Sequence, residues 1–399
     1  MVSKRQLFLR HVAQTSAHSL QFEIKRAEGV WFYDTDDRPY LDLVSGVSVS
    51  ALGHGHPAVV EAVKQQAGAY MHTMVYGEFI QSPQVAYAAW LTERLPAALD
   101  NVFFVNSGSE AIDGALKLAR RFTGRTQIRA FEQAYHGGTY GALSVLGSAS
   151  ARSGFLPVIP GVKHLRFNNW EDLLLVDEAV AAVVVEPIQA EAGIIEPAIG
   201  ADGRNFLQAL RLRCTATGTL LIVDEIQTGM GRSGELLAST HYGIEPDILC
   251  LAKSFGGGMP LGAFIAGRER MRSLTYDPPL GHITTFGGHP VSCAAGLAAQ
   301  KVVESEGLMK HALEMESRYR EGLKHPRIKS LRGRGLFLAV VLNEGEDVNR
   351  FIDLAFKRGM VIDRFLFGEG AFRIAPPLLI TEKEVDRSIE MLLAVLDEL

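Results

Sequence analysis

Four apolar runs in the sequence are each followed by side chains that could take part in chemistry. Runs without polar alternation are typical of strands covered on both faces in a mostly parallel sheet. Because ligands bind beyond the carboxyl ends of such strands, we expect these side chains to share one site. The runs and the residues that follow them are 102–105 with Ser107 and Ser109, 181–185 with Glu186, 220–223 with Asp224, and 248–251 with Lys253.

The first group could bind a phosphate. Ser107, Gly108 and Ser109 stand between a predicted strand and a predicted helix over residues 110–122. Free backbone N–H groups and the dipole at a helix N-terminus attract anions. Ordinary helix capping by Ser109 explains the same serines equally well, so this motif alone leaves both interpretations open.

Acidic residues follow the apolar runs 181–185 and 220–223. Asp224, at a buried strand end, needs a cationic partner, because burial of an unpaired carboxylate raises its pKa. A protonated pyridine nitrogen would be such a partner. A magnesium ligand is a weaker interpretation, since the chain contains no GxxxxGK[ST] loop. Glu186 begins a segment that also contains Glu191, and a solvated loop is the plain alternative for Glu191.

Lys253 lies between a buried run and the glycines at 256–258. Burial and nearby cations lower the pKa of a lysine and make it a nucleophile toward carbonyls. A side chain that extends into solvent is the commoner fate of a single lysine. A phosphate site, an acid for a ring nitrogen and a Schiff-base lysine are the three parts that pyridoxal 5′-phosphate (PLP) requires. Their conjunction therefore predicts a PLP site.

The alternation of apolar runs with helical patterns predicts an α/β fold. A long helical stretch at 301–323, strand-like runs and a final helix over 381–399 predict a compact α+β unit. A hairpin is predicted within 29–46, and we expect it to pack with that unit. The predicted organisation is an N-terminal segment at 1–55, a large α/β domain at 56–300 and a small α+β domain at 301–399.

Composition narrows the class of protein further. The chain has 399 residues, of which 47% are hydrophobic, and its formal net charge is -5. There is no basic stripe, so nucleic acid is not an expected partner. The three cysteines lack CxxC or metal-like spacing, so we expect no metal site and a reducing compartment. No run approaches the roughly 20 apolar residues of a membrane helix, and no signal peptide is evident, so a soluble cytoplasmic protein is expected.

In combination, the motifs resemble those of the class III aminotransferases, a branch of the fold-type-I PLP-dependent enzymes. The resemblance extends from near Gly29 to near Pro377. It implies a large domain with a mostly parallel central sheet, together with a smaller α+β domain. The motifs are NSGSEA at 106–111, YHG at 135–137, EPIQAEAG at 186–193, DEIQTGMGRSG at 224–234, PDILCLAKSFGGGMPLGA at 246–263 and TTFGGHP at 284–290.

The resemblance implies a role for each matching polar residue around the cofactor ring. Lys253 would form the Schiff base and then move a proton between the substrate carbon and the cofactor. Asp224 would pair with the protonated ring nitrogen, and Gln227 would contact the phenolic oxygen. Glu186 would support Asp224 and His136.

It also implies how the cofactor is held at its other faces. Ser107, Gly108 and Ser109 would bind the phosphate, and Tyr135 would stack on the ring beside His136. Thr285 would reach the phosphate of the neighbouring subunit. A homodimer with shared active sites is then the smallest assembly.

Three further residues are implied to face the substrate. In the family, an arginine at the position of Arg373 binds an α-carboxylate, and a glutamate at the position of Glu191 neutralises it for substrates that lack one. The sequence therefore suggests a Glu191–Arg373 gate that admits 2-oxoglutarate or glutamate in one half-reaction. Tyr76 is our expected pocket residue in the aromatic segment 74–79, which could equally belong to the core.

One departure from the family pattern bears on the substrate. Many acetylornithine and 4-aminobutyrate enzymes have an arginine directly after the YHG motif, whereas this chain has Gly138 followed by Thr139. A contact with the distal carboxylate of such substrates is therefore in doubt. The form in diaminopelargonate aminotransferases is closer.

The function implied is transfer of an amino group from an amino acid or amine donor to an oxo acid, either 2-oxoglutarate or pyruvate, by a ping-pong mechanism. An aminomutase, racemase or decarboxylase of the same fold would use the same cofactor residues. A PLP-binding protein without turnover is a remote alternative, because both Lys253 and Asp224 are present. A dinucleotide enzyme is weaker still, since no GxGxxG follows the first strand.

Overall fold

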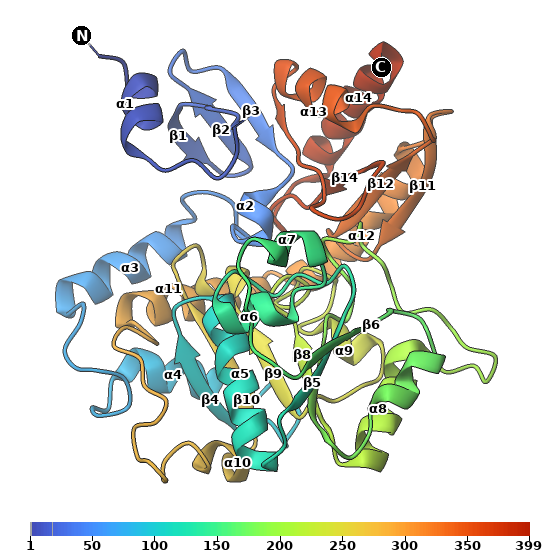
Figure 1. The fold of residues 1–399 in the computed structure, drawn as a ribbon. Helices are drawn as coiled ribbons and strands as arrows, with labels where there is room; N and C mark the ends of the chain where they lie inside the picture. Colours follow the sequence, from blue (N-terminus) through green and yellow to red (C-terminus); the bar gives the residue numbers. More distant parts are fainter. Residues whose placement is uncertain (1, 18) are drawn as a thin grey trace.

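The computed structural model describes residues 2–17 and 19–399, and it consists of a large α/β part with a smaller part above it (Figure 1). In the view of Figure 1 the blue N-terminal strands and the red C-terminal elements lie together on one side of the large sheet. The predicted α/β class is confirmed. The ends of the strands on one side of the large sheet therefore face the smaller part.

The large sheet has the strand order β4-β10-β9-β8-β7-β5-β6. The strands from β9 to β6 pair in parallel, while β10 runs antiparallel to both of its neighbours. Every residue of β7 is buried, as expected for a strand covered on both faces. The strands are β4 (Asn101–Val105), β5 (Gln127–Phe131), β6 (Val162–Leu165), β7 (Val180–Val185), β8 (Leu220–Asp224), β9 (Ile248–Leu251) and β10 (Gly262–Ala266).

Helices cover the large sheet and connect its strands. Helix α5 (Gly108–Thr123) follows β4 after two residues and buries the face predicted from its periodicity, including Ile112 and Ala115. In the described residues, no helix is long and apolar enough to cross a membrane. The other helices of this part are α3 (Pro57–Ala69), α4 (Ser82–Thr92), α6 (Tyr140–Val145), α7 (Ala149–Ser153), η1 (Glu171–Leu175), α8 (Phe206–Thr217), α9 (Ala238–His241), η2 (Lys253–Gly256), α10 (Arg268–Arg272) and α11 (Pro290–Ser305).

The smaller part is built from residues near both ends of the chain. Strands β2 and β3 form the predicted hairpin, and β13 pairs in parallel with β3. Leu41 is fully buried in one core cluster with Leu338 and Phe372. The elements are α1 (Lys4–His11), β1 (Ile24–Glu28), β2 (Trp31–Asp34), β3 (Pro39–Asp42), α2 (Ser45–Ser48), α12 (Leu308–Gly322), β11 (Ile328–Gly333), β12 (Leu338–Leu342), α13 (Val348–Lys357), β13 (Met360–Val361), β14 (Ala371–Ile374) and α14 (Glu382–Glu398).

Two sequence expectations differ from the structure. The stretch 301–323 is not one helix, because α11 ends at Ser305 and α12 begins at Leu308 after Gly307, whose φ is 64°. A residue in the left-handed region cannot continue an α-helix, and glycine adopts that region without strain. Helix α11 also runs across the predicted domain boundary at residue 300, so the chain passes between the two parts within a helix.

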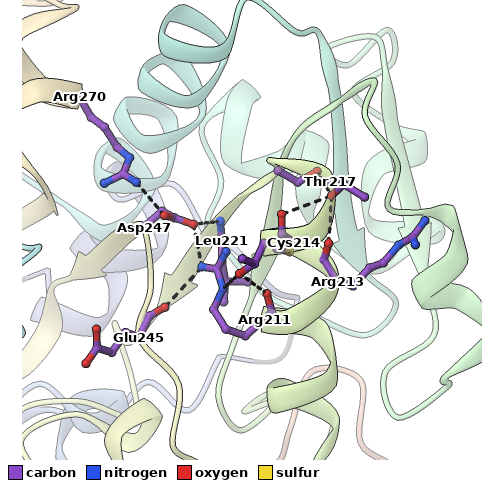
Figure 2. Close-up of polar contacts among 10 residues, drawn as sticks. Arg211, Arg213, Cys214, Thr217, Leu221, Glu245, Asp247 and Arg270 are labelled. Carbon is purple, nitrogen blue, oxygen red and sulfur yellow. Dashed lines mark hydrogen bonds and ion pairs between the residues drawn. The ribbon is translucent and has the colours of Figure 1, made fainter.

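A cluster of charged residues connects elements of the large part near the N-terminal ends of the parallel strands (Figure 2). The carboxylate of Asp247 accepts hydrogen bonds from Arg211 of α8 at 2.7 Å, from Arg270 of α10 at 2.9 Å and from the Leu221 backbone N–H at 2.9 Å. One acid therefore links two helices to the start of β8. The candidate site lies at the other end of these strands, where they end.

Candidate active site

A cavity of about 380 Å³ lies at the carboxyl edge of the large sheet. It is lined by residues that follow β4, β7, β8 and β9 and by the turn at 135–137. Most of the residues singled out in the sequence meet here, although they lie far apart along the chain. They are Ser107, Gly108, Ser109, Tyr135, His136, Glu186, Asp224, Gln227 and Lys253.

Lys253 enters the cavity directly after β9. Its φ is 53°, a left-handed backbone conformation that costs a residue with a side chain about 1–3 kcal/mol and occurs mostly at functional sites. Its Nζ donates a hydrogen bond to Gln227 Oε1 at 2.8 Å. Burial, together with the positive charge of Arg373, lowers the pKa of Lys253 to about 8. A substantial fraction of the amine is therefore neutral and nucleophilic near physiological pH.

Asp224 is the centre of a buried acid–imidazole group. Its Oδ2 lies 2.7 Å from His136 Nδ1, and its Oδ1 accepts the Ile226 N–H at 3.0 Å. Burial alone would lower the pKa of His136, but the Asp224 carboxylate outweighs it, and the pKa of His136 is raised overall. Burial also raises the pKa of Glu186 to about 7. Glu186 accepts the N–H groups of Tyr135 and Ala190, at 3.2 Å and 3.1 Å.

The start of α5 has the free N–H groups expected of an anion-binding helix N-terminus. Ser107 is the N-cap, and its Oγ accepts the Glu110 N–H at 3.2 Å, so the capping interpretation holds for Ser107 and not for Ser109. The Oγ of Ser109 accepts the N–H of Gly138 at 3.1 Å. Gly137 lies so close to this serine that a Cβ there would be 2.1 Å from Ser109 Oγ. The turn at 135–138 is therefore packed closely against the start of α5.

The polar atoms left over fit PLP. Gln227 Nε2 and His136 Nε2 are buried and have no hydrogen-bond partner within the described part of the chain. Buried donors of this kind point to a missing acceptor. A phenolic oxygen near Gln227 would accept from its Nε2, phosphate oxygens would accept from the N–H groups at the start of α5, and a protonated ring nitrogen would donate to Asp224. Tyr135 lines the cavity and is 37% exposed, and burial raises its pKa.

Glu191 and Arg373 form a buried ion pair next to this group. Arg373 is 1% exposed, and its Nη2 lies 2.8 Å and 3.0 Å from the two Glu191 oxygens. Neither residue is part of the cavity lining, but the charges of both act on Lys253. Glu191 Oε2 also accepts the Leu366 N–H at 3.0 Å. The pair therefore lies close to the amine but outside the wall of the cavity.

The structure does not bring Tyr76 and Thr285 to the cavity. The Tyr76 hydroxyl lies between the Val102 carbonyl, at 3.3 Å, and the Phe104 N–H, at 3.2 Å, and the ring packs on Phe103. Tyr76 thus binds the edge strand β4, and burial raises its pKa to about 12. Thr285 is exposed in the segment between α10 and α11. Within one chain it lies outside the cavity lining.

Sequence reasoning missed one charged residue of this region. Asp363 follows β13 and is partly buried, and its Oδ1 lies 3.3 Å from Arg373 Nε. Its backbone oxygen accepts the Arg373 N–H at 3.0 Å. An acid directly after the apolar pair Val361–Ile362 repeats the pattern that marked Asp224, so the same strand-end criterion could have found it.

Comparison with known proteins agrees with this geometry. The family model for aminotransferase class-III matches residues 12–396. An acetylornithine aminotransferase from Gloeobacter violaceus is 38% identical, over 97% of this chain and 96% of its own. One from Methanopyrus kandleri is 40% identical over 91% of each chain. The solved ornithine aminotransferase of Toxoplasma gondii, described with partial PLP occupancy in its active site, has a TM-score of 0.89 and 30% identity, and covers 100% of this chain and 96% of its own.

Fold and cavity together define a PLP-dependent transferase of the α/β class. More specifically, the chain belongs to the aminotransferase class-III family. It is a PLP-dependent aminotransferase that acts on an amino donor and an oxo acid.

Proposed function

We propose that the protein transfers an amino group between an amine donor and 2-oxoglutarate, with glutamate as the matching product, in a ping-pong sequence. The observation that supports this acceptor is the buried Glu191–Arg373 pair beside Lys253. One site must receive two substrates in turn, and only some of them have an α-carboxylate. An arginine that exchanges Glu191 for a substrate carboxylate meets that requirement.

The residues of the chain have separate tasks in this proposal. PLP, when bound, supplies the electron sink that makes the substrate Cα–H acidic. Lys253, with its pKa lowered to about 8, accepts that proton from the substrate carbon and delivers it to the cofactor. Asp224 holds a positive charge on the ring nitrogen, and His136 fixes the Asp224 carboxylate. Ser107, Gly108 and Ser109 hold the phosphate, while Tyr135 covers the ring.

The surroundings of Gly138 affect which amino donors we expect the protein to accept. Its N–H binds Ser109, no atom lies within 4 Å of the position of a Cβ, and the described cavity lining includes no arginine. A distal carboxylate such as that of acetylornithine then has no cationic partner on this side. We expect acetylornithine to be a poorer donor than an amine without a distal carboxylate. A donor screen at fixed 2-oxoglutarate tests this, and acetylornithine as the best donor would contradict it.

We also propose a homodimer in which Thr285 reaches the phosphate in the other subunit. Thr285 is exposed and lies in a segment with exposed apolar side chains, among them Ile283 and Phe286. Ile80 is 94% exposed, and exposed apolar side chains that gather in one patch mark interaction sites. Light scattering of the purified protein measures the assembly.

The Arg373→Ala variant tests the acceptor assignment. We expect its KM for 2-oxoglutarate to rise about tenfold to a hundredfold, because a charged hydrogen-bonding partner contributes about 1.5–3 kcal/mol. Arg373→Lys, which keeps a counter-charge for Glu191, should give an intermediate value. Steady-state kinetics with varied 2-oxoglutarate measures both.

The matched control is Arg364→Ala, since Arg364 is an exposed arginine in the loop that precedes β14. It should leave the KM for 2-oxoglutarate unchanged. Equal KM values for wild type and Arg373→Ala would overturn the assignment. Formation of one glutamate per oxidised donor distinguishes transamination from racemisation, mutase activity or decarboxylation.

A further inference from the structure

Arg373 has two carboxylate neighbours, and they lie against different nitrogens of the guanidinium. Glu191 occupies Nη2 with both oxygens, at 2.8 Å and 3.0 Å. Asp363 lies on the other side, with Oδ1 3.3 Å from Nε. That distance makes an ion pair, but the alignment falls short of a hydrogen bond.

The third nitrogen of the same guanidinium, Nη1, has no hydrogen-bond partner among the described residues. Nη1 of Arg373 is buried and makes no hydrogen bond within the residues that the structure describes. A buried guanidinium N–H without an acceptor is costly, so the arrangement is incomplete until an acceptor arrives. A substrate carboxylate can bind through Nη1 and Nη2 together, which requires Glu191 to withdraw from Nη2.

The two acids are held in different ways. Besides Arg373, the Glu191 carboxylate has the N–H of Leu366, at 3.0 Å. Asp363 is fixed to Arg373 itself, because the Asp363 carbonyl oxygen accepts the Arg373 backbone N–H at 3.0 Å. Glu191 lies in the segment after β7, and its backbone oxygen accepts the N–H groups of Phe367 and Gly368 at 2.9 Å and 3.0 Å, so its side chain is the part that can withdraw.

We infer that Asp363 is a positioning residue for substrate carboxylates: it stays at the Nε edge of Arg373 when Glu191 withdraws, and so keeps the guanidinium in its binding orientation. This inference rests on the proposed role of Arg373 in binding the acceptor. Without Asp363, a guanidinium that has released Glu191 has no remaining acidic partner on its buried side. Part of the binding free energy of each carboxylate is then spent on ordering Arg373.

The test compares Asp363→Asn with wild type in the PLP-loaded enzyme. The substitution removes the charge but keeps the backbone contact with Arg373. Calorimetric titration with glutarate, a dicarboxylate that cannot react, should show an affinity about tenfold weaker, as expected for loss of one charged contact. The KM for 2-oxoglutarate should rise by a similar factor, kcat should change little, and the KM for 1-butylamine, which has no carboxylate, should stay unchanged.

Two further variants sharpen the test. Asp363→Glu restores the charge and should recover most of the glutarate affinity. Glu369→Gln removes an exposed charge from the same loop and should leave the affinity unchanged. Unchanged or tighter glutarate binding in Asp363→Asn would overturn the inference, as would an equal loss for 1-butylamine. If Arg373→Ala also fails to weaken glutarate binding, the proposed acceptor site itself is wrong.

Discussion

The amine of Lys253 has an environment that disfavours its charged form. Burial and Arg373 lower its pKa, while Glu191, Asp224 and Glu186 oppose them. The lysine therefore lies among one cation and several acids. In the proposed mechanism, the withdrawal of Glu191 from Arg373 would change the electrostatic environment of Lys253, so substrate binding at Arg373 would be linked to the basicity of the amine.

The lowered pKa has a measurable effect on stability. A depressed pKa of about 8, against 10.5 for a free lysine, means that the folded cofactor-free protein binds the Lys253 proton less tightly than the unfolded chain does. The stabilising contribution of the neutral amine is complete above pH 10.5 and is lost as the pH falls through about 8. Lys253→Met should therefore be more stable than wild type at pH 7, by about 2 kcal/mol after allowance for partial exposure.

Urea unfolding of both cofactor-free proteins between pH 7 and pH 10.5 measures this difference. The stability gap should close as the pH rises. Lys301→Met, at an exposed lysine of α11, should show no such dependence. A gap for Lys253→Met that stays constant with pH would show that the amine is not desolvated as described.

Much of the cavity could be predicted from residue types at strand ends. Lys253, Asp224, Glu186 and the serines at 107–109 were found in this way, and all of them line the cavity. Tyr76 shows the limit of the method, because an aromatic residue in a loop has no pattern that separates pocket from core. Its hydroxyl binds the backbone of β4, a contact across distant segments that no local spacing encodes.

At the scale of elements, the turn at 135–137 and the start of α5 form one unit. Gly137 has a φ of 125°, and a Cβ there would be 2.1 Å from Ser109 Oγ. Gly137→Ala should destabilise the protein by about 1–3 kcal/mol, from strain and displacement of Ser109. We expect PLP affinity to fall as well, because the displaced serine is one of the residues proposed to bind the phosphate. Urea unfolding and a spectroscopic PLP titration measure the two effects.

The adjacent residue supplies the control for this experiment. At Gly138 no atom lies within 4 Å of the position of a Cβ, so Gly138→Ala meets no clash. It should leave both quantities nearly unchanged. If the two alanine variants behave alike, close packing of the turn against α5 does not matter for cofactor binding.

The order of the strands along the chain was easier to predict than their pairing within the sheet. Apolar runs without alternation located β4, β7, β8 and β9, since strands buried on both faces have that composition. The antiparallel insertion of β10 between β4 and β9 was not predicted. Its composition resembles that of the parallel strands, and strand direction follows from the path of the chain. The break between α11 and α12 was missed for a local reason, because a single glycine interrupts an otherwise helical pattern.

At the scale of the whole molecule, the proposed sharing of sites can be tested by mixing variants. One subunit has Lys253→Ala, and the other has Thr285→Arg, whose bulk would block a phosphate site in the other subunit. Each variant alone should be inactive. In mixed dimers, the Thr285→Arg subunit keeps its own Lys253 and receives an intact Thr285 from its partner. Random mixing should restore about a quarter of the wild-type activity, because about half of the dimers are mixed and each has one intact site of two.

A second mixture provides the control. His136 and Lys253 line the same cavity within one chain, so mixing His136→Ala with Lys253→Ala leaves every site defective. No activity should return. Failure of the first mixture to regain activity, with exchange of subunits demonstrated by light scattering of tagged chains, would contradict a shared site.

The position of β4 at the edge of the large sheet has a thermodynamic consequence. β4 is hydrogen-bonded to the rest of the sheet through β10, and α5 begins just beyond it. A ligand that contacts α5, Asp224 and Lys253 at once binds only when this long-range arrangement is complete, so it favours the native state over the unfolded chain. At a thousandfold excess over its dissociation constant, such a ligand adds about 4 kcal/mol to the free energy of unfolding. The supply of the vitamin-derived cofactor would then set the lifetime of the polypeptide as well as its rate of turnover.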